Sequence, residues 1–198
     1  MAFSGPPALA GAMRVIAFTG MPGAGKGVAA EVARKQNIPV LRMGDFIWEE
    51  VRRRGLPIDS GSVAEVAMQM RTDFGPGVWA EKTVDRIRQL HPNMAVIDGV
   101  RSEAELEVFR HRLGHDFTLV AIHASRPTRM KRLLVRGRED DVKDEGEFIA
   151  RDERELGWGL GRVIALADVM LVNEETMPDL AQQVERMIRG EPVYKGLR

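Results

Sequence analysis

A glycine-rich segment near the start of the chain has the residue types and spacing of a phosphate-binding loop. It reads GMPGAGKG and lies between an apolar run and a stretch of helix-forming residues. Glycines after a strand let successive backbone N–H groups turn toward an anion, and the following helix adds its positive dipole end. Lys26 supplies a positive charge for nucleotide phosphates. The predicted nucleotide-binding residues are Gly20, Met21, Pro22, Gly23, Ala24, Gly25, Lys26 and Gly27.

A carboxylate later in the chain is the candidate for positioning a metal ion. In many such loops a serine or threonine after the lysine binds Mg²⁺, but here Gly27 and Val28 follow Lys26. Asp98 ends the apolar run AVID, three residues before Arg101. A carboxylate at the end of a strand beside the glycine loop can hold Mg²⁺, directly or through water. We therefore predict that Asp98 positions Mg²⁺, most simply through water, and that Arg101 binds the phosphate of an acceptor.

A second cluster, MGDF, follows the second apolar run. Gly44 and Asp45 open a helix that ends in three consecutive arginines, at 52–54. One interpretation of Asp45 is a helix N-cap, and the other is a residue that contacts an acceptor or acts as a general base. We expect Arg52 to turn inward toward the acceptor and the other two arginines to be solvated.

A third cluster is rich in arginine and predicts a lid over residues 136–147. An arginine-rich flap suits phosphoryl transfer, because its cations stabilise charge on the transferring group once water is excluded. Arg138 is the predicted catalytic member. The predicted lid arginines are Arg129, Arg136, Arg138 and Arg151. The alternative is a salt-bridged surface that uses the acidic residues Asp140, Asp141, Asp152 and Glu153.

Strands and helices alternate along the chain, as in an α/β protein with a parallel sheet. Five short apolar runs predict strands at 15–18, 40–43, 95–97, 117–122 and 169–172. Helical periodicity predicts helices at 28–35, 46–54, 63–71, 78–90, 103–113, 128–136, 147–156 and 180–189. Capping boxes are predicted at Ser102 with Glu105 and, more weakly, at Thr176 with Asp179. We expect a three-layer sandwich with its ligands at the carboxyl ends of the strands.

The predicted organisation is a single domain over residues 13–190. A helical acceptor-binding insert occupies about 45–90 and the short lid about 136–147. Residues 1–12 lack both a basic region and a continuous apolar region, so we interpret them as a disordered extension rather than a targeting segment. Met13 could be the native start. Residues 191–198 are predicted to form a tail.

Composition excludes several classes of function. The 198 residues include 29 basic and 29 acidic side chains, so no global field attracts nucleic acid. Cysteine is absent, which excludes disulfides, thiolate metal sites and cysteine nucleophiles. No apolar run has the ~20 residues of a membrane helix. We expect a cytoplasmic protein, a monomer or weak dimer, whose partner is a small-molecule nucleotide acceptor.

These motifs together resemble the nucleoside monophosphate kinase group. The glycine loop, MGDF, VIDGVR, RGREDD and ADVMLVNEE carry the resemblance, which spans residues 13–189. Within this group the chain resembles an uncharacterised archaeal family of adenylate kinase-related P-loop proteins. The resemblance implies a P-loop NTPase fold and an ATP-dependent phosphotransferase with Mg²⁺.

The chain also departs from the adenylate kinase pattern. Gly27 is shared with adenylate kinases, but Val28 stands where they usually have threonine. Trp48 lies near the position of an arginine that binds the acceptor phosphate, which puts AMP specificity in doubt. The segment from Ala167 to Asn173 resembles dephospho-CoA kinases, in which this part of the chain lies beside the adenine, so Asn173 is the candidate for the base pocket.

The sequence favours a kinase that transfers the γ-phosphoryl group of ATP to a nucleoside monophosphate. A hydroxyl acceptor, as in dephospho-CoA kinase, is the alternative and would use Asp45 as general base. A different class is a nucleotide-binding switch or assembly factor with slow ATP hydrolysis, which the missing hydroxyl after Lys26 and the presence of Trp48 would suit.

Overall fold

A five-stranded parallel sheet forms the centre of the molecule. The computed structural model describes residues 13–136 and 142–193. The strand order is β2-β3-β1-β4-β5, so β1 occupies the middle. All four pairings are parallel, and β1 pairs with β3 and β4 on its two sides. The strands are β1 (Arg14–Thr19), β2 (Val40–Arg42), β3 (Met94–Asp98), β4 (Phe117–His123) and β5 (Val169–Val172).

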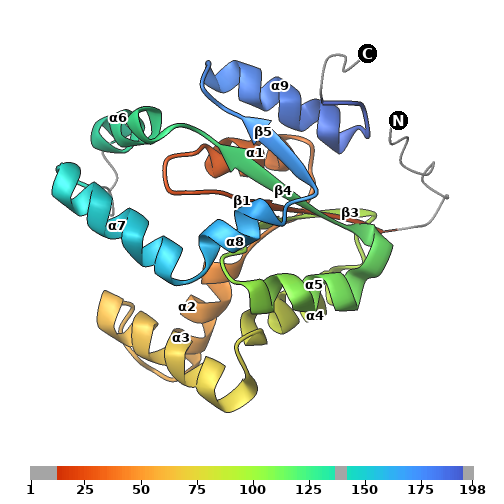
Figure 1. The fold of residues 1–198 in the computed structure, drawn as a ribbon. Helices are drawn as coiled ribbons and strands as arrows, with labels where there is room; N and C mark the ends of the chain where they lie inside the picture. Colours follow the sequence, from red (N-terminus) through yellow and green to blue (C-terminus); the bar gives the residue numbers. More distant parts are fainter. Residues whose placement is uncertain (1–12, 137–141, 194–198) are drawn as a thin grey trace.

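Helices cover both faces of this sheet, which confirms the predicted three-layer α/β fold (Figure 1). The helices of the described residues are α1 (Lys26–Lys35), α2 (Met43–Arg53), α3 (Ser60–Phe74), α4 (Val78–Leu90), α5 (Glu103–Leu113), α6 (Arg126–Arg136), α7 (Glu145–Gly157), α8 (Leu160–Ala165) and α9 (Met177–Ile188). A single 3₁₀ turn, Gly114–Asp116, leads into β4.

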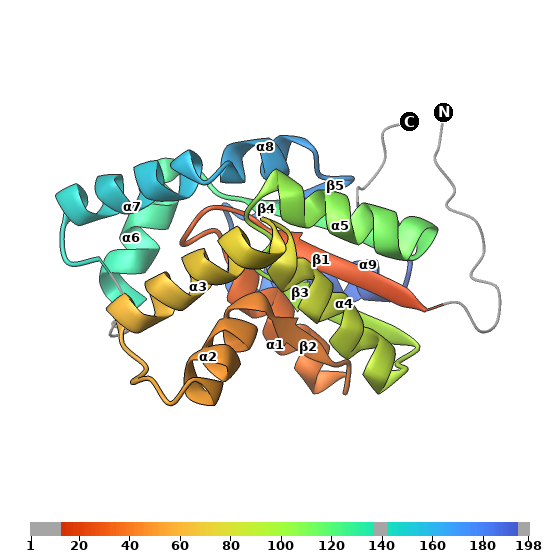
Figure 2. The same ribbon diagram turned by 90° about the horizontal axis from the view of Figure 1, so that it is seen from below.

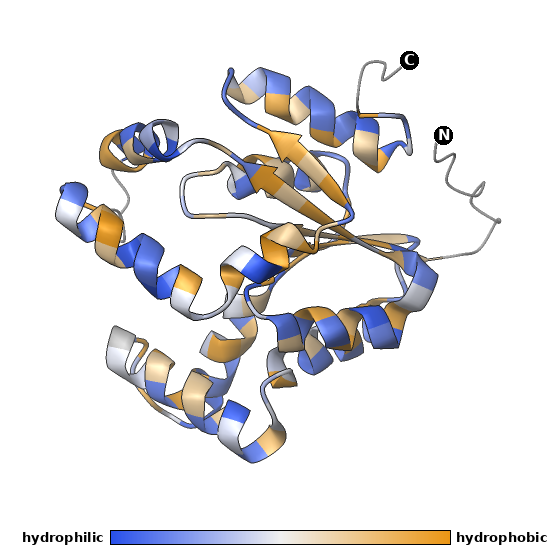
Figure 3. Ribbon diagram, viewed as in Figure 1, coloured by the Kyte–Doolittle hydropathy of each residue, from blue (hydrophilic) through white to orange (hydrophobic). Residues whose placement is uncertain are grey.

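Side chains that alternate along the strands divide the core into two layers. Val15 and Ala17 of β1 face the layer built with α2, α3, α4, α5 and α8. Ile16 and Phe18 face the opposite layer, which contains side chains of α1 and α9. The strands are apolar over most of their length, whereas the helices have an apolar and a polar side (Figure 3). This is the pattern expected when helices cover both faces of a parallel sheet.

Most predicted elements are present, and their ends differ by a few residues. The strand at 40–43 ends at Arg42, because Met43 already belongs to α2. The strand at 95–97 extends to Met94–Asp98, so Asp98 is the last residue of β3. Helix α8 was not predicted, because its six residues are too few to show a helical period.

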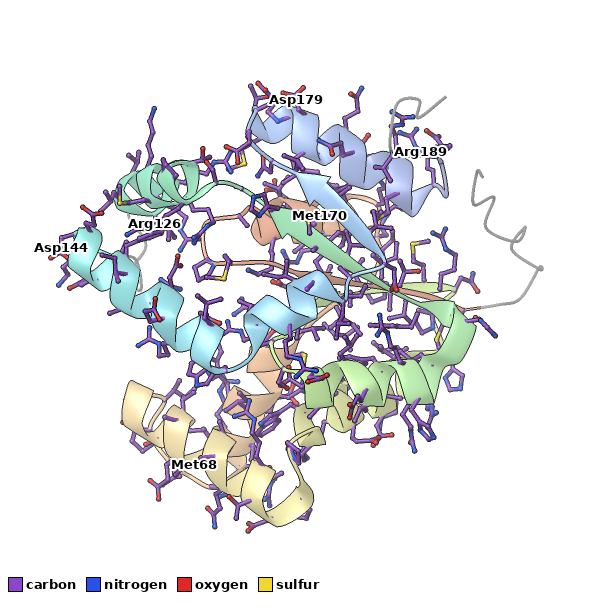
Figure 4. The ribbon with its side chains drawn as sticks, in the orientation of Figure 1. Met68, Arg126, Asp144, Met170, Asp179 and Arg189 are labelled. Carbon is purple, nitrogen blue, oxygen red and sulfur yellow. The ribbon has the colours of Figure 1, made fainter. Side chains whose placement is uncertain are left out.

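The predicted helix caps have different outcomes. Both capping boxes are complete, at Ser102 with Glu105 and at Thr176 with Asp179. Asp179 lies at the start of α9 (Figure 4). The N-cap interpretation of Asp45 is wrong, because α2 already begins at Met43 and Arg42 occupies the N-cap. Asp45 instead lies in the first helical turn, where a negative charge interacts favourably with the helix dipole.

The expected orientation of the arginines at the end of α2 is wrong for Arg52 and Arg54, whereas Arg53 is largely exposed as expected. Arg52 is exposed. The Arg54 side chain is 24% exposed and that of Arg53 is 72% exposed. Both arginines donate to the buried Glu50 carboxylate. Arg54 Nη1 also donates to Gln69 of α3 at 2.7 Å. The two paired arginines therefore connect helices of the insert.

This pairing predicts an acid-sensitive contribution to stability. Hydrogen bonds from Arg53, and then those from Arg54, lower the pKa of Glu50 from 4.5 to about 2 against the opposing effect of burial. A carboxyl with a lowered pKa stabilises the fold above its ordinary pKa and loses that contribution as the pH falls toward 2. We expect Glu50→Gln to cost roughly 1 to 2 kcal/mol at pH 7, discounted for the exposed Arg53 partner, and to flatten the loss of stability between pH 4.5 and 2.

Urea unfolding at several pH values measures both effects. Glu49→Gln is the matched control, because Glu49 is half-exposed on the same helix and pairs with the partly exposed Arg86 at 3.1 Å. An acid profile of Glu50→Gln that overlays the wild-type profile would contradict this assignment.

Three segments of the chain, which include one predicted site residue, lie outside the part that the structure describes. These are residues 1–12, 137–141 and 194–198, and the site residue is Arg138. Within the described residues, every helix is too short or too polar to cross a membrane.

Candidate functional site

The predicted glycine loop connects the central strand β1 to α1. We call residues 20–27 the P-loop. Gly25 caps α1 with a φ of 115°, a left-handed conformation that favours glycine. A Cβ at Gly25 would overlap the Asn173 amide and come within 2.8 Å of Leu180. Glycine at this position therefore fits both the backbone conformation and the close packing against the loop.

The P-loop and two groups of helices lie beyond the carboxyl ends of the strands. Helices α6 and α7 lie beside the P-loop, and α2 and α3 lie at the same end of the sheet (Figures 1 and 2). Ligands of open parallel sheets bind at this end. The predicted insert and the helices that flank the predicted lid thus border the same region.

Lys26 is the first residue of α1 and its ammonium folds back onto the loop. Nζ donates to the carbonyl oxygen of Gly20 and, at 3.4 Å, to that of Met21. Burial lowers the pKa of Lys26 from 10.5 to about 8, although the charge of Asp98 acts in the opposite direction. The ammonium is therefore still the major form at pH 7, and it loses its proton far below the range of an exposed lysine.

Asp98 lies beside the P-loop, as predicted. Its strand β3 is the neighbour of β1, and Phe18 pairs in register with Asp98. The turn that follows is tied back to β1: Gly99 N donates to the Phe18 carbonyl at 3.2 Å, and Thr19 Oγ1 donates to the Val100 carbonyl at 2.8 Å. These bonds fix the carboxylate next to the loop, where its charge acts on Lys26.

The Asp98 carboxylate has the chemistry expected of a Mg²⁺ ligand. It is partly exposed, and within the described part of the chain no hydrogen bond or ion pair engages its oxygens. The described residues contain no group of three or more His, Cys, Asp or Glu that could hold a metal by themselves. One available carboxylate beside a phosphate loop suits an ion that also binds water and phosphate oxygens.

Arg101 also lies at this end of the sheet and reaches across to α7. Its Nη1 donates to Glu155 Oε1 at 3.2 Å. The Arg101 backbone N–H donates to Glu105 of α5 at 2.9 Å, so the main chain is held as well. Both Arg101 and Glu155 act electrostatically on Lys26, and so does Arg151 of α7. Three chain segments, β3, the turn after it and α7, thus bring four charged groups to the P-loop lysine.

The structure gives Arg129 a different role from the predicted one. Its guanidinium is buried and forms a two-pronged ion pair with Asp152 of α7, at 2.8 and 2.5 Å. Nη1 also donates to the Pro22 carbonyl of the P-loop at 3.0 Å, and the guanidinium stacks on Phe148. Arg129 is therefore a structural connection between α6, α7 and the P-loop, rather than a lid cation that can meet phosphate.

Asn173, the candidate for the base pocket, is also placed differently. It is 2% exposed. Its Nδ2 donates to the Ala24 carbonyl at 2.8 Å, and Arg132 donates to its Oδ1 at 3.3 Å and to its main-chain oxygen at 3.0 Å. The side chain therefore packs against the P-loop at Ala24. Its burial there disfavours contact with a nucleotide base.

The predicted acceptor residues of α2 lie apart from the lysine cluster. Asp45 is 47% exposed and pairs with Arg42 at 3.5 Å, while the Arg42 guanidinium also stacks on Trp48. Gly44 and Arg52 are exposed. No charge of α2 is among those that shift the Lys26 pKa. The structure therefore brings Asp98, Arg101 and Arg151 to Lys26 but leaves the α2 candidates outside this cluster.

Two hollows in the described region are lined by residues of α2 and α4 and by none of the Lys26 cluster. They have volumes of about 290 and 240 Å³ and lie against α2 and α4, beside the edge strand β2. Charged residues such as Glu49 and Arg86 line both. They contain none of the P-loop residues and do not form the candidate site.

Comparison with known proteins identifies the family. A protein of Methanothermobacter thermautotrophicus described as a UPF0200 protein is 44% identical over 177 residues, which cover 89% of this chain and 90% of the relative. UPF0200 protein PH1008 of Pyrococcus horikoshii is 38% identical, over 88% of this chain and 95% of its own. This chain belongs to the UPF0200 family. The family described as "AAA domain" also matches residues 19–148 of this UPF0200 protein.

Solved structures show the same fold at low sequence identity. TT1252 from Thermus thermophilus superposes with a TM-score of 0.58 at 17% identity, covering 90% of the UPF0200 chain and 95% of its own. A shikimate kinase from Acinetobacter baumannii, solved with shikimate, reaches 0.54 at 16% identity over 90% and 94%. A gluconokinase from Sinorhizobium meliloti reaches 0.54 at 14% over 86% and 89%. The UPF0200 protein therefore has a P-loop kinase-like fold, as predicted.

Glu155 is the site residue of this UPF0200 protein that sequence reasoning missed. It lies four residues after Arg151, a spacing that places the two on one face of a helix. That spacing was a usable signal, but α7 contains several acidic residues and Asp152 is buried as well, so only the tertiary contact with Arg101 distinguishes Glu155.

Proposed function

We propose that this UPF0200 protein is an ATP-dependent kinase that transfers the γ-phosphoryl group to a small nucleotide-like acceptor, with a nucleoside monophosphate as the favoured acceptor. The observation that carries the proposal is the charge cluster around Lys26. Asp98, Arg101, Glu155 and Arg151 come from β3, the turn after it and α7, and all act on the P-loop lysine. A loop that bound nucleotide without chemistry would not need these charges at its open end.

In this proposal the P-loop binds the nucleotide. Lys26 and the backbone N–H groups of residues 23–27 hold the β- and γ-phosphates. Asp98 holds Mg²⁺ through water. When bound, Mg²⁺ offsets the negative charge that develops on the phosphates during transfer.

The acceptor binds between the P-loop and the insert at residues 45–90. Arg101 binds the acceptor's phosphate. Its guanidinium is half-exposed beside the P-loop, and a guanidinium can donate two hydrogen bonds to one phosphate. Gly44 and Asp45, in the first turn of α2, border the acceptor. A phosphate acceptor is already ionised and needs cations rather than a general base, which favours it over a hydroxyl at a site with arginines.

The lid, residues 136–147, brings further arginines over the transferring group. Arg136, Arg138 and Arg151 are its cations in this proposal. Arg129 holds the base of the lid against the P-loop through Asp152 and the Pro22 carbonyl. In this proposal the other three arginines act at the reacting centre, and Arg129 attaches the lid to the P-loop.

A hydroxyl acceptor is the second candidate, and the fold neighbours favour it. Two of them are named a shikimate kinase and a gluconokinase, and both names denote kinases of small hydroxy acids. In this version Asp45 is the general base. A third candidate is a nucleotide-dependent switch that hydrolyses ATP slowly.

A comparison of Arg101→Ala with Asp45→Asn distinguishes the acceptor classes. The best acceptor is first identified by a screen of nucleoside monophosphates, dephospho-CoA, shikimate and gluconate with ATP and Mg²⁺. For a phosphate acceptor, Arg101→Ala should weaken kcat/KM by about 1.5 to 3 kcal/mol, the value of a charged hydrogen bond, and Asp45→Asn by less. For a hydroxyl acceptor, Asp45→Asn should instead lower kcat by about 10² to 10⁴.

Two controls test for general damage. Arg162→Ala removes an exposed arginine that pairs with Glu103 at 2.9 Å, and Asp116→Asn alters the amino end of β4, opposite the P-loop. Both should keep wild-type kinetics. A larger loss at Asp45 than at Arg101 would overturn the phosphate acceptor. ATP binding without transfer to any compound of the screen would favour the switch.

A further inference from the structure

Glu155 is a buried carboxylate in a region that we assign to phosphate. It is 5% exposed and lies on α7. A buried carboxylate needs a partner, because burial without one is costly. Among the described residues its partner is Arg101, on a turn 54 residues earlier in the chain. A negative charge close to bound phosphates is itself unfavourable, so its presence calls for a specific role.

The contact with Arg101 uses only part of that guanidinium. Arg101 donates to Glu155 through Nη1 alone, and its side chain is 52% exposed. A guanidinium carries five N–H donors in a rigid plane, so fixing one edge also fixes the direction of the others. The remaining donors of Arg101 therefore stay available to an anion in a defined orientation.

Glu155 also offsets the repulsion among the cations of the site. The charged groups that act on Lys26 are Asp98 of β3, Arg101 of the following turn, and Arg151 and Glu155 of α7. The two arginines lower the pKa of Lys26, and the two carboxylates raise it. Loss of Glu155 would therefore remove one of the two carboxylate charges that favour the charged form of Lys26.

We propose that Glu155 is a positioning residue that holds the Arg101 guanidinium beside the P-loop so that its open edge binds the phosphate of a phosphomonoester acceptor. This inference rests on the proposed function and deepens it. Glu155 acts through Arg101 and does not itself contact the acceptor. The contact comes from α7, so it ties the orientation of the acceptor arginine to the placement of that helix.

The test compares Glu155→Gln and Glu155→Ala with Glu153→Gln. Glu153 is exposed on the same helix and serves as the matched control. Glutamine keeps the size of the buried side chain, so this variant should fold even where alanine does not. AMP is the probe for phosphate binding, and adenosine, which has the same base and no phosphate, is the reference ligand. Binding of both is measured by isothermal titration calorimetry.

Glu155→Gln should weaken AMP binding about 5- to 20-fold and leave adenosine binding unchanged. The effect should vanish in the absence of Arg101: Arg101→Ala and the double variant should bind AMP equally. A role limited to packing would weaken both ligands alike and would add to the loss from Arg101→Ala. Equal losses for AMP and adenosine, or additive losses in the double variant, would overturn the proposal.

A second readout requires no ligand. NMR titration of the Lys26 side chain should give a pKa below the wild-type value of about 8 in Glu155→Gln, lower by roughly 0.5 to 1 unit, because one nearby carboxylate charge is removed. Glu153→Gln should leave it unchanged. A Lys26 titration identical in Glu155→Gln and wild type would overturn the placement of Glu155 at the site. If wild type binds ATP but not AMP, the acceptor assignment fails, whereas Lys26 titration still tests that placement.

Discussion

Replacing Lys26 with methionine is expected to abolish measurable turnover and to weaken ATP binding at least about 100-fold. The ammonium is the formal charge of the P-loop, and each charged hydrogen bond to a phosphate is worth about 1.5 to 3 kcal/mol. Isothermal titration with ATP and Mg²⁺ measures the loss of affinity. Lys35→Met is the control, because Lys35 is exposed at the other end of α1 and pairs with the exposed Glu31.

The same variant should be close in stability to wild type without nucleotide. Burial lowers the pKa of Lys26 from 10.5 to about 8, so folding disfavours its charged form at pH 7. A lysine with a lowered folded pKa makes the protein more stable as the pH rises between these two values, where the unfolded chain holds more protons. Methionine removes that cost. Methionine also loses the hydrogen bonds to the Gly20 and Met21 carbonyls, so the melting temperature at pH 7 should stay close to the wild-type value. The stability of wild type relative to Lys26→Met should rise between pH 8 and 10.5, and parallel pH profiles would contradict the desolvated ammonium.

The lowered pKa also predicts how ATP affinity depends on pH. The affinity of wild type should fall as the pH rises through about 8, when the ammonium loses its proton. Lys26→Met should lack this limb of the profile. A wild-type affinity that stays constant to pH 10 would show that Lys26 keeps an ordinary pKa.

Arg129→Met is expected to cost about 3 to 5 kcal/mol of stability, the second large effect. The guanidinium is 6% exposed and its partner Asp152 is 13% exposed, so the variant leaves a carboxylate buried without its counter-charge. The Pro22 carbonyl also loses its donor. Urea unfolding at pH 7 measures the loss. If Arg129 acted as a lid cation instead, turnover would fall and stability would not.

Arg126→Met is the matched control on the same helix. Arg126 also lies over Phe148 and pairs with an acidic residue of α7, Glu145, but at 3.6 Å and with 56% of its side chain exposed (Figure 4). Its replacement should cost less than about 1 kcal/mol. The double variant Arg129→Met with Asp152→Leu should recover much of the loss, because both charges are then absent. No recovery would mean that the contact with the P-loop carbonyl dominates.

The sequence by itself determined the fold class, the P-loop and the strand-end position of Asp98. These features depend on local patterns: alternation of short apolar runs with helical periodicity, glycines before a lysine, and a carboxylate at the end of a run. Because parallel strands all end at one edge of a sheet, that order along the chain was enough to place Asp98 near Lys26. None of these three predictions required knowledge of a contact between residues far apart in the sequence.

Only the tertiary structure decided which charged side chains meet. Arg129 pairs with Asp152 and Pro22, Asn173 supports Ala24, and Arg101 meets Glu155, across separations of 23 to 149 residues. Local spacing contains no information on such pairs, and an arginine bound to phosphate has the same sequence pattern as one in a buried ion pair. The packing of α6 and α7 against the P-loop buries one arginine with its partner and leaves another half-exposed. That difference in burial separates the structural cation from the candidate ligand.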